Sequence, residues 1–193
     1  MNSEILLALE NIVGSAYIFI DDATRNTYGH DETEDLSFPP QVVVKPANTF
    51  EVSEILKISN RYKIPTVPIG ARTGLSGGAL AIYGGIGISM ERFNKILEID
   101  ERNLQITTEP GVITQVLREA AAEKGLLYPV DPSSMGSCWI GGNIAENSGG
   151  ARALKYGVTK DYVLNLEVVL PTGDIIWTGA NTLKNSTGYN LTQ

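Results

Sequence analysis

The sequence predicts a mixed fold of helices and strands that falls into two successive parts. Strand and helix patterns alternate in the first half of the chain, whereas short strands joined by tight turns dominate the second half. The change between the two patterns is best placed at Glu98–Arg102. We therefore expect one domain of two subdomains, the first over about residues 1–98 and the second over about residues 99–193.

The chain begins with an amphipathic helical pattern. Apolar residues recur at helical spacing from Ser3 to Ile12, with Ser3 as the expected N-cap and Gly14 as the expected end. A stretch rich in Asp, Thr and Glu follows over Asp21–Asp35, and the sequence assigns it no element.

A strand–helix–strand unit is predicted next. Val42–Val44 is typical of a buried strand, and Thr66–Ile69 of a second one. Between them Thr49 is the expected cap of a helix whose apolar face consists of Val52, Ile55, Leu56 and Tyr62. We expect the two strands to be parallel because a helix connects them.

The remaining elements are hairpins and one helix. Alternating apolar residues predict a strand at Ile86, Ile88 and Met90, then a hairpin in which the turn "DERN" joins Ile96–Ile99 to Leu104–Thr108. A second hairpin is centred on "PTGD". Thr114 is the expected cap of a helix over Gln115–Lys124, stopped by Gly125, whose inward residues are Val116, Leu117, Ala120 and Ala121.

Composition limits the possible functions. Fifteen basic and 22 acidic side chains give a net charge of −7, which repels nucleic acids and anionic membranes. No apolar run approaches the ~20 residues that span a bilayer, and no leader pattern is found, so we expect a cytoplasmic protein. With only Cys138 and His30, neither a disulfide nor a zinc site is expected. Redox chemistry would therefore require a cofactor.

The glycines are concentrated in two clusters. The first is "VPIGARTGLSGGA", Val67–Ala79, which directly follows a predicted strand. Glycine lets backbone N–H groups approach a ligand, and successive N–H groups form a nest for phosphate. Thr73 and Ser76 would add hydroxyl donors and Arg72 a charge, although a tight surface loop also collects glycines. The spacing matches neither a Rossmann fingerprint nor a Walker loop.

The second cluster is Tyr128–Gly157, in which glycines alternate with amide and hydroxyl side chains. Such interleaving suits a flat ligand with many heteroatoms held by main-chain groups. A long loop without a function would be uncommon in a compact domain.

These motifs together resemble a known family. "VPIGARTGLSGGA", "EPGV", "DPSS", "IGGNIAENSGG", "KYG" and "LEVVLPTGD" occur in the order found in the FAD-binding domain of the vanillyl-alcohol oxidase and p-cresol methylhydroxylase superfamily. The branch of glycolate oxidase FAD-binding subunits and D-lactate dehydrogenases is the most similar. The resemblance implies an α+β fold of two subdomains with FAD in the cleft between them. It also implies that a D-2-hydroxy acid loses a hydride from C2 to the flavin N5, and that the electrons then pass to a quinone, an iron–sulfur partner or another acceptor.

The resemblance also implies the residues that hold the cofactor. The pyrophosphate is expected to be wrapped by Pro68, Ile69, Gly70, Ala71, Arg72, Thr73, Gly74, Leu75, Ser76, Gly77 and Gly78. The rest of the nucleotide is expected to be lined by Pro132, Ser133, Ser137, Gly141, Gly142, Asn143, Asn147, Ser148, Gly149 and Gly150, with Tyr156 and Gly157 closing the wall.

The sequence departs from the family pattern in two places. Family members often have glycine at the position of Arg72 and arginine or glutamine at that of Ile69, so Arg72 either contacts a ligand or lies on the surface. The chain also ends at "STGYNLTQ", which in the family precedes a further flavin contact and a substrate domain with the catalytic histidine and, in many members, a metal. We expect this cap domain to be absent, and we name neither a catalytic residue nor a metal site.

Three single residues carry side chains that could take part in chemistry. His30 is expected to be a solvent-exposed or turn histidine rather than a general base, and Lys184 a surface lysine. Some relatives attach FAD covalently through a histidine in the first cluster or a cysteine near the second. The first cluster has no histidine, and Cys138 is typical of a buried thiol, so we expect FAD to be bound non-covalently.

Two other functions remain open from the sequence. One is an enolpyruvyl-sugar reductase of the same superfamily. The other is a non-catalytic module that binds flavin or transfers electrons.

Overall fold

A four-stranded sheet organises the first half of the molecule, in a computed structural model that describes residues 1–193. The strand order is β1–β2–β4–β3, formed by Ile18–Phe19, Val42–Val44, Ile86–Ser89 and Thr66–Ile69. β2 and β3 both run parallel to β4, which lies between them, and β1 pairs antiparallel with β2. The parallel strand–helix–strand unit is therefore confirmed, although its two strands are not neighbours. β4 ends before Met90, which the sequence pattern had included.

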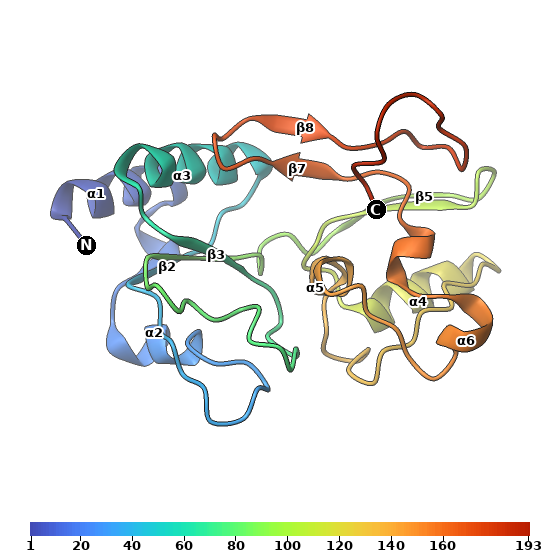
Figure 1. Cartoon of the computed structure of the whole chain (residues 1–193), viewed down its shortest axis with the longest axis horizontal. Helices are drawn as coiled ribbons and strands as arrows, with labels where there is room; N and C mark the ends of the chain where they lie inside the picture. Colours follow the sequence, from blue (N-terminus) through green and yellow to red (C-terminus); the bar gives the residue numbers. More distant parts are fainter.

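Both faces of this sheet are covered. On one face α1 (Ser3–Val13) and α3 (Thr49–Tyr62) pack against alternate strand residues such as Val42 and Val44. Val43 points to the opposite face, where it packs against Tyr28. Figure 1 shows α1 and α3 along one side of the sheet and α2 (Asp22–Thr27) on the other. The period-2 alternation of a strand thus decides on which face of the sheet each residue packs.

The helix starts differ from the sequence prediction by one residue. α1 is capped by Asn2, whose side chain accepts a 2.9 Å hydrogen bond from the Glu4 N–H, so Ser3 is the first helical residue. Asn48 caps α3 in the same way, in place of Thr49. Asparagine is at least as good an N-cap as serine or threonine, so both observed caps agree with the usual preference. Gly14 ends α1 as predicted.

The second half contains a hairpin packed on a helix. β5 (Ile96–Asp100) pairs antiparallel with β6 (Gln105–Thr108), which confirms the predicted hairpin. α4 (Thr114–Glu123) begins at Thr114 itself, because Ile113 occupies the cap position and Thr114 is buried. Leu117 and Ala121 face inward as expected, whereas Val116 and, in α3, Tyr62 are exposed.

A third sheet, β7 (Glu167–Val169) with β8 (Ile175–Trp177), confirms the hairpin around "PTGD". This hairpin packs on α3 of the first half of the chain and not on the second half alone. The Ser53 hydroxyl of α3 donates a 2.5 Å hydrogen bond to the Gly173 carbonyl in the β7–β8 turn, and the Thr49 hydroxyl donates to Glu167. Figure 1 shows the hairpin lying beside α3, while α4 lies at the other end of the molecule.

Several short elements had no sequence signal. Besides β1 and α2, these are α5 (Ile140–Ala145), α6 (Ala153–Tyr156) and two 3₁₀ turns at Ser15–Tyr17 and Thr159–Tyr162. None of the helices is long and apolar enough to cross a bilayer.

Candidate functional site

The first glycine cluster forms the connection between β3 and β4. It leaves β3 after Ile69, at the carboxyl edge of the parallel strands, where open α/β sheets commonly bind ligands. Its path is fixed from one side by the segment that follows Tyr28. The Glu32 N–H donates to the Gly74 carbonyl at 3.1 Å, and the Gly77 N–H donates to the Thr33 hydroxyl at 3.0 Å.

Between these anchors the loop leaves its donors free. None of the backbone N–H groups from Gly70 to Ser76 donates a hydrogen bond within the protein. Residues Gly70–Gly74 are half-buried, so this is not a fully hydrated surface turn. Unpaired half-buried N–H groups are costly unless an acceptor reaches them. The loop therefore offers free donors to an acceptor-rich ligand.

The second cluster begins with α5, and its two glycines differ in role. Gly141 packs tightly, because a Cβ there would lie 2.6 Å from Pro110 Cβ, and its N–H donates to the Pro110 carbonyl at 2.7 Å. Gly142 has no atom within 4 Å of its Cβ position, and its N–H has no partner in the protein. Gly141 thus fixes the helix, and Gly142 presents open backbone.

Asn143 points into the protein interior. It is 2% exposed, and its amide nitrogen donates a 2.5 Å hydrogen bond to the Thr114 hydroxyl. That hydroxyl also lies 3.2 Å from the buried Cys138 thiol. The chain Asn143–Thr114–Cys138 therefore joins α5 to the start of α4. The thiol lies in a packed interior, as the sequence analysis expects.

The segment after α5 is held by the 3₁₀ turn Thr159–Tyr162. The Ser148 carbonyl accepts bonds from the Thr159 N–H and hydroxyl, and the Asn147 carboxamide oxygen accepts from the Lys160 N–H at 3.0 Å. Next to them, the N–H groups of Gly149 and Gly150 have no partner. Gly150 lies directly on the backbone of Asp131, which a Cβ would approach to 1.9 Å.

The remaining predicted residues are spread around these two segments. Pro132 is buried, while Ser133, Ser137 and Tyr156 are exposed. The Tyr162 hydroxyl donates to the Tyr156 carbonyl. His30 and Lys184 are both exposed, and no group of three or more potential metal ligands is found together.

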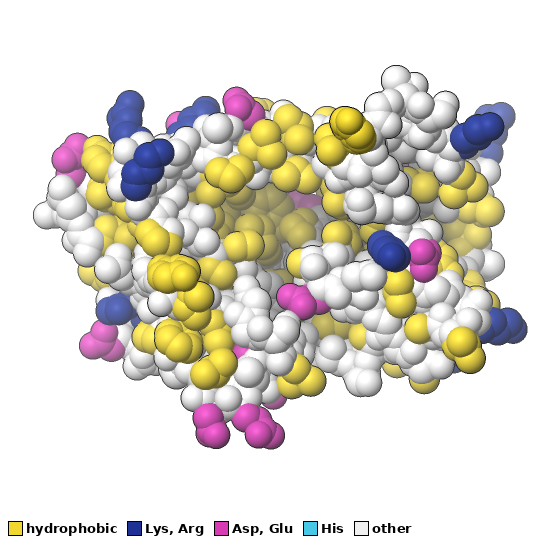
Figure 2. Space-filling view, viewed as in Figure 1, with side chains coloured by type: hydrophobic (Ala, Val, Ile, Leu, Met, Phe, Trp, Pro, Cys, Tyr) yellow, Lys and Arg dark blue, Asp and Glu magenta, His cyan; other side chains and the backbone are white.

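The structure brings the two glycine clusters together. The Ser76 hydroxyl donates a 3.0 Å hydrogen bond to the Glu146 carboxylate at the end of α5, and a Cβ on Gly70 would lie 4.0 Å from the Trp139 ring. Figure 2 shows a hollow in the middle of this face, with hydrophobic side chains in its depth. Neither Glu146 nor Trp139 was singled out from the sequence. Glu146 lies inside the motif "IGGNIAENSGG" and Trp139 directly precedes it, which is the only sequence signal that could have indicated them.

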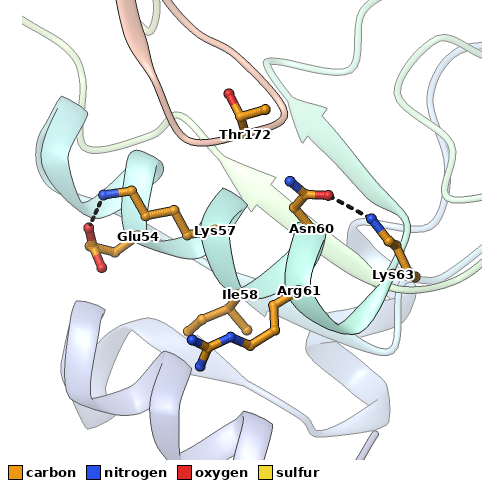
Figure 3. A pocket seen from close by; sticks show the side chains of 7 residues that line it. All are labelled: Glu54, Lys57, Ile58, Asn60, Arg61, Lys63 and Thr172. Carbon is orange, nitrogen blue, oxygen red and sulfur yellow. Dashed lines mark hydrogen bonds and ion pairs between the residues drawn. The ribbon is translucent and has the colours of Figure 1, made fainter.

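Another surface pocket, of ≈ 600 Å³, lies between α3 and the β7–β8 turn (Figure 3). Its lining is charged and polar, but two of its cations already have partners: Lys57 pairs with Glu54 at 2.7 Å, and the Lys63 ammonium donates to Asn60 at 2.9 Å. None of its lining residues belongs to either glycine cluster. We assign the candidate site to the region where the two glycine clusters meet, because both clusters contain N–H groups without a partner in the protein.

Facing segments with free N–H groups at the edge of a parallel sheet define a nucleotide-binding domain. The family described as "FAD binding domain" matches residues 40–179, and the chain belongs to this family. The free N–H groups of Gly70–Ser76, Gly142, Gly149 and Gly150 fit a ligand as rich in acceptors as FAD.

Similar proteins agree with this assignment. The chain is 51% identical over 172 residues to a glycolate oxidase subunit of Bacillus subtilis, covering 89% of this chain and 37% of that protein. It is 44% identical over 175 residues to a D-lactate dehydrogenase of Anaerostipes hadrus, covering 90% and 37%. The chain thus spans well under half the length of these relatives. Its fold matches p-cresol methylhydroxylase with a TM-score of 0.80 at 22% identity, covering 98% of this chain and 37% of that one. The predicted α+β fold of this type is confirmed.

Proposed function

We propose that this chain is the FAD-binding portion of a flavin-dependent oxidoreductase that oxidises a D-2-hydroxy acid of the glycolate or D-lactate type. The observation that carries the proposal is the row of unpaired N–H groups from Gly70 to Ser76, in a loop that the Ser76–Glu146 hydrogen bond joins to the end of α5. A diphosphate offers the acceptors that these donors lack. The substrate class follows from the names of the two relatives.

Each part of the chain has a distinct task in this proposal. The loop Pro68–Gly78 wraps the pyrophosphate, and the predicted residues of the second cluster, from Pro132 to Gly157, line the rest of the nucleotide. Asn143 supports α5 through Thr114, so that the open backbone at Gly142 is held in place. When bound, FAD would supply at N5 the acceptor for the hydride that leaves C2 of the hydroxy acid, which becomes a 2-oxo acid once its hydroxyl proton is also lost to a base.

The attachment is proposed to be non-covalent. The Cys138 thiol is 4% exposed and sits against the Thr114 hydroxyl, so it cannot approach a flavin ring without opening the packing around α4. The two-subdomain division near residue 98, the cytoplasmic location and a quinone or iron–sulfur acceptor remain part of the proposal.

The test is the visible absorbance spectrum of the purified chain, with FAD added if it is isolated colourless. We expect a bound-flavin spectrum that survives gel filtration. A chain that never retains flavin would contradict the proposal. Bleaching of the bound flavin by D-lactate or glycolate under anaerobic conditions would support the hydroxy-acid part. Bound flavin that neither acid reduces would instead favour the non-catalytic flavin-binding module.

A further inference from the structure

Arg72 is the one cation in the first glycine loop, and its backbone is strained. Its φ is +59°, in the left-handed region that a residue with a Cβ adopts only at a cost. Strain of this kind persists where the surroundings hold it, and it often marks a functional site. The contacts of the Arg72 side chain show what holds it in this conformation.

Tyr28 holds the side chain of Arg72. The guanidinium carbon lies 4.9 Å from the centre of the Tyr28 ring, a cation–π contact. Tyr28 is 5% exposed and packs on Val43 and Ile69 of the sheet, so the ring is a fixed surface. Arg72 follows Ile69 by three residues, and its stacking position is set by the end of β3.

An ion pair in turn fixes Tyr28. Its hydroxyl donates to Glu91, which also accepts a 2.6 Å bond from the Lys45 ammonium. Lys45 follows β2 and Glu91 follows β4, so both stand at the same carboxyl edge of the sheet as the loop. Lys45 also lies over the rings of Phe19 and Tyr28, at 5.0 and 5.3 Å. Lys45 and Glu91 thus fix the Tyr28 ring, and the ring in turn orients the Arg72 guanidinium.

That guanidinium has no polar partner. Arg72 makes no hydrogen bond through its side chain, and no carboxylate lies within 4.0 Å of it, although the adjoining segment 31–35 is rich in acids. By contrast, Arg25, Arg92 and Arg152 all form ion pairs. The side chain is half-buried, and the N–H groups beside it are free as well. Together they make a concentration of unused donors suited to an anion.

We propose that Arg72 binds the diphosphate of the FAD that the proposed function requires, and that Tyr28 is the positioning residue that aims it. The inference rests on the proposed function. It adds to the diphosphate site a positive charge, which the glycine backbone alone does not supply. A planar guanidinium can hold phosphate oxygens with two parallel N–H bonds while its face stays on the tyrosine ring.

The test is flavin affinity of this chain, measured by fluorescence quenching with FAD and with riboflavin, which has no phosphate. We expect Arg72→Gly to weaken FAD binding about tenfold or more, because a charged hydrogen bond is lost. Riboflavin affinity should change less than about twofold, since an ordinary site mutation would affect both ligands. Arg61→Ala, which removes an exposed cation from α3, is the control and should change neither.

Three further readouts separate this role from a structural one. Arg72→Gly relieves the backbone strain, so its FAD-free melting temperature should not fall below that of the parent chain. The dependence of FAD affinity on salt should also be shallower in this variant. Tyr28→Phe keeps the ring but loses the hydroxyl bond to Glu91, and should weaken FAD binding to a smaller degree.

The outcomes are distinct. A parent chain that binds no FAD overturns the proposed function. A parent chain that binds FAD, with Arg72→Gly binding it within twofold, overturns this inference and leaves the proposed function standing. If Arg72→Gly loses affinity for FAD and for riboflavin to the same degree, this inference is also overturned.

Discussion

Ser53 and Gly173 join two parts of the chain that lie 120 residues apart, through a 2.5 Å hydrogen bond from the serine hydroxyl to the glycine carbonyl. Both residues are buried. A Cβ on Gly173 would lie 2.4 Å from Lys57 Cγ, so the turn sits directly on α3. The contact sets how the β7–β8 hairpin rests on the first half of the molecule.

Ser53→Ala should therefore destabilise the chain. The Gly173 carbonyl would be left buried without its donor, at a cost of about 1–3 kcal/mol in the free energy of unfolding. Urea titration measures this, with Ser37→Ala as the control, because Ser37 is exposed and forms no hydrogen bond. Equal stability of the two variants would show that the hairpin does not depend on this bond.

Neighbouring glycines in α5 should respond differently to alanine. Gly141→Ala places a methyl group 2.6 Å from Pro110 Cβ, so we expect a clear loss of stability without ligand. Gly142→Ala meets nothing within 4 Å and gains helix propensity, so its FAD-free stability should stay equal or rise by up to about 1 kcal/mol.

The Gly141→Ala and Gly142→Ala variants also test whether FAD lies against α5. If FAD lies against Gly142, the added methyl group should weaken FAD binding while the fold is intact. Thermal melts with and without FAD measure both effects, because a ligand that binds only the folded chain raises its melting temperature. Full FAD stabilisation of Gly142→Ala would place the cofactor away from α5.

The Lys45–Glu91–Tyr28 cluster should make stability depend on pH. Burial alone would raise the pKa of Glu91, but hydrogen bonds from Lys45 and Tyr28 outweigh it and lower this pKa. Burial would lower the pKa of Lys45, but its bonds to Glu91 and Tyr28 raise it. For Tyr28, burial and the bond to Glu91 together raise the pKa.

The signs set the pH window. A carboxyl whose pKa is lowered by folding stabilises the protein above its unfolded-state pKa, about 4.3 for glutamate, and this stabilisation is lost as pH falls through the folded value. The lysine contribution is complete below its unfolded-state pKa of about 10.4 and is lost as pH rises through the folded value. We therefore expect the free energy of unfolding, measured with urea, to decrease both at acidic pH and at strongly alkaline pH. Glu91→Gln should weaken the acid dependence, whereas the exposed Glu123→Gln should preserve it.

Cys138→Ala should retain FAD. The thiol is buried against Thr114, so its loss should cost on the order of 1 kcal/mol of stability and leave the flavin content unchanged. Mass spectrometry of the denatured parent chain checks the same point. A mass increased by one flavin would contradict non-covalent attachment.

The sequence predicted the regular elements better than their connections. Val42–Val44 and Thr66–Ile69 were confirmed because β-branched apolar runs bounded by turns have few alternatives. The N-caps at Ser3 and Thr49 were wrong because an asparagine precedes each of them. α5 was missed because two of its six residues are glycines, which sequence patterns assign to loops.

The site was only partly predictable for a different reason. The glycine clusters could be found because their composition is local. The partners of these clusters are distant in the sequence: Tyr28 bonds to Glu91 across 63 positions, and Ser76 to Glu146 across 70. No periodicity encodes such contacts, so the network behind Arg72 and the link between the clusters required the folded chain.

The docking of the β7–β8 hairpin on α3 has a consequence for the order of folding. The surface of α3 around Ser53 can be covered only after Gly173 has been synthesised, so during translation it stays open to water for most of the time the domain takes to emerge. Contacts of such long sequence separation slow folding, because loop-closure entropy is lost before they form. The two halves of the chain should thus complete their folding together, with hydrogen exchange in α3 and β7 slowing at the same step.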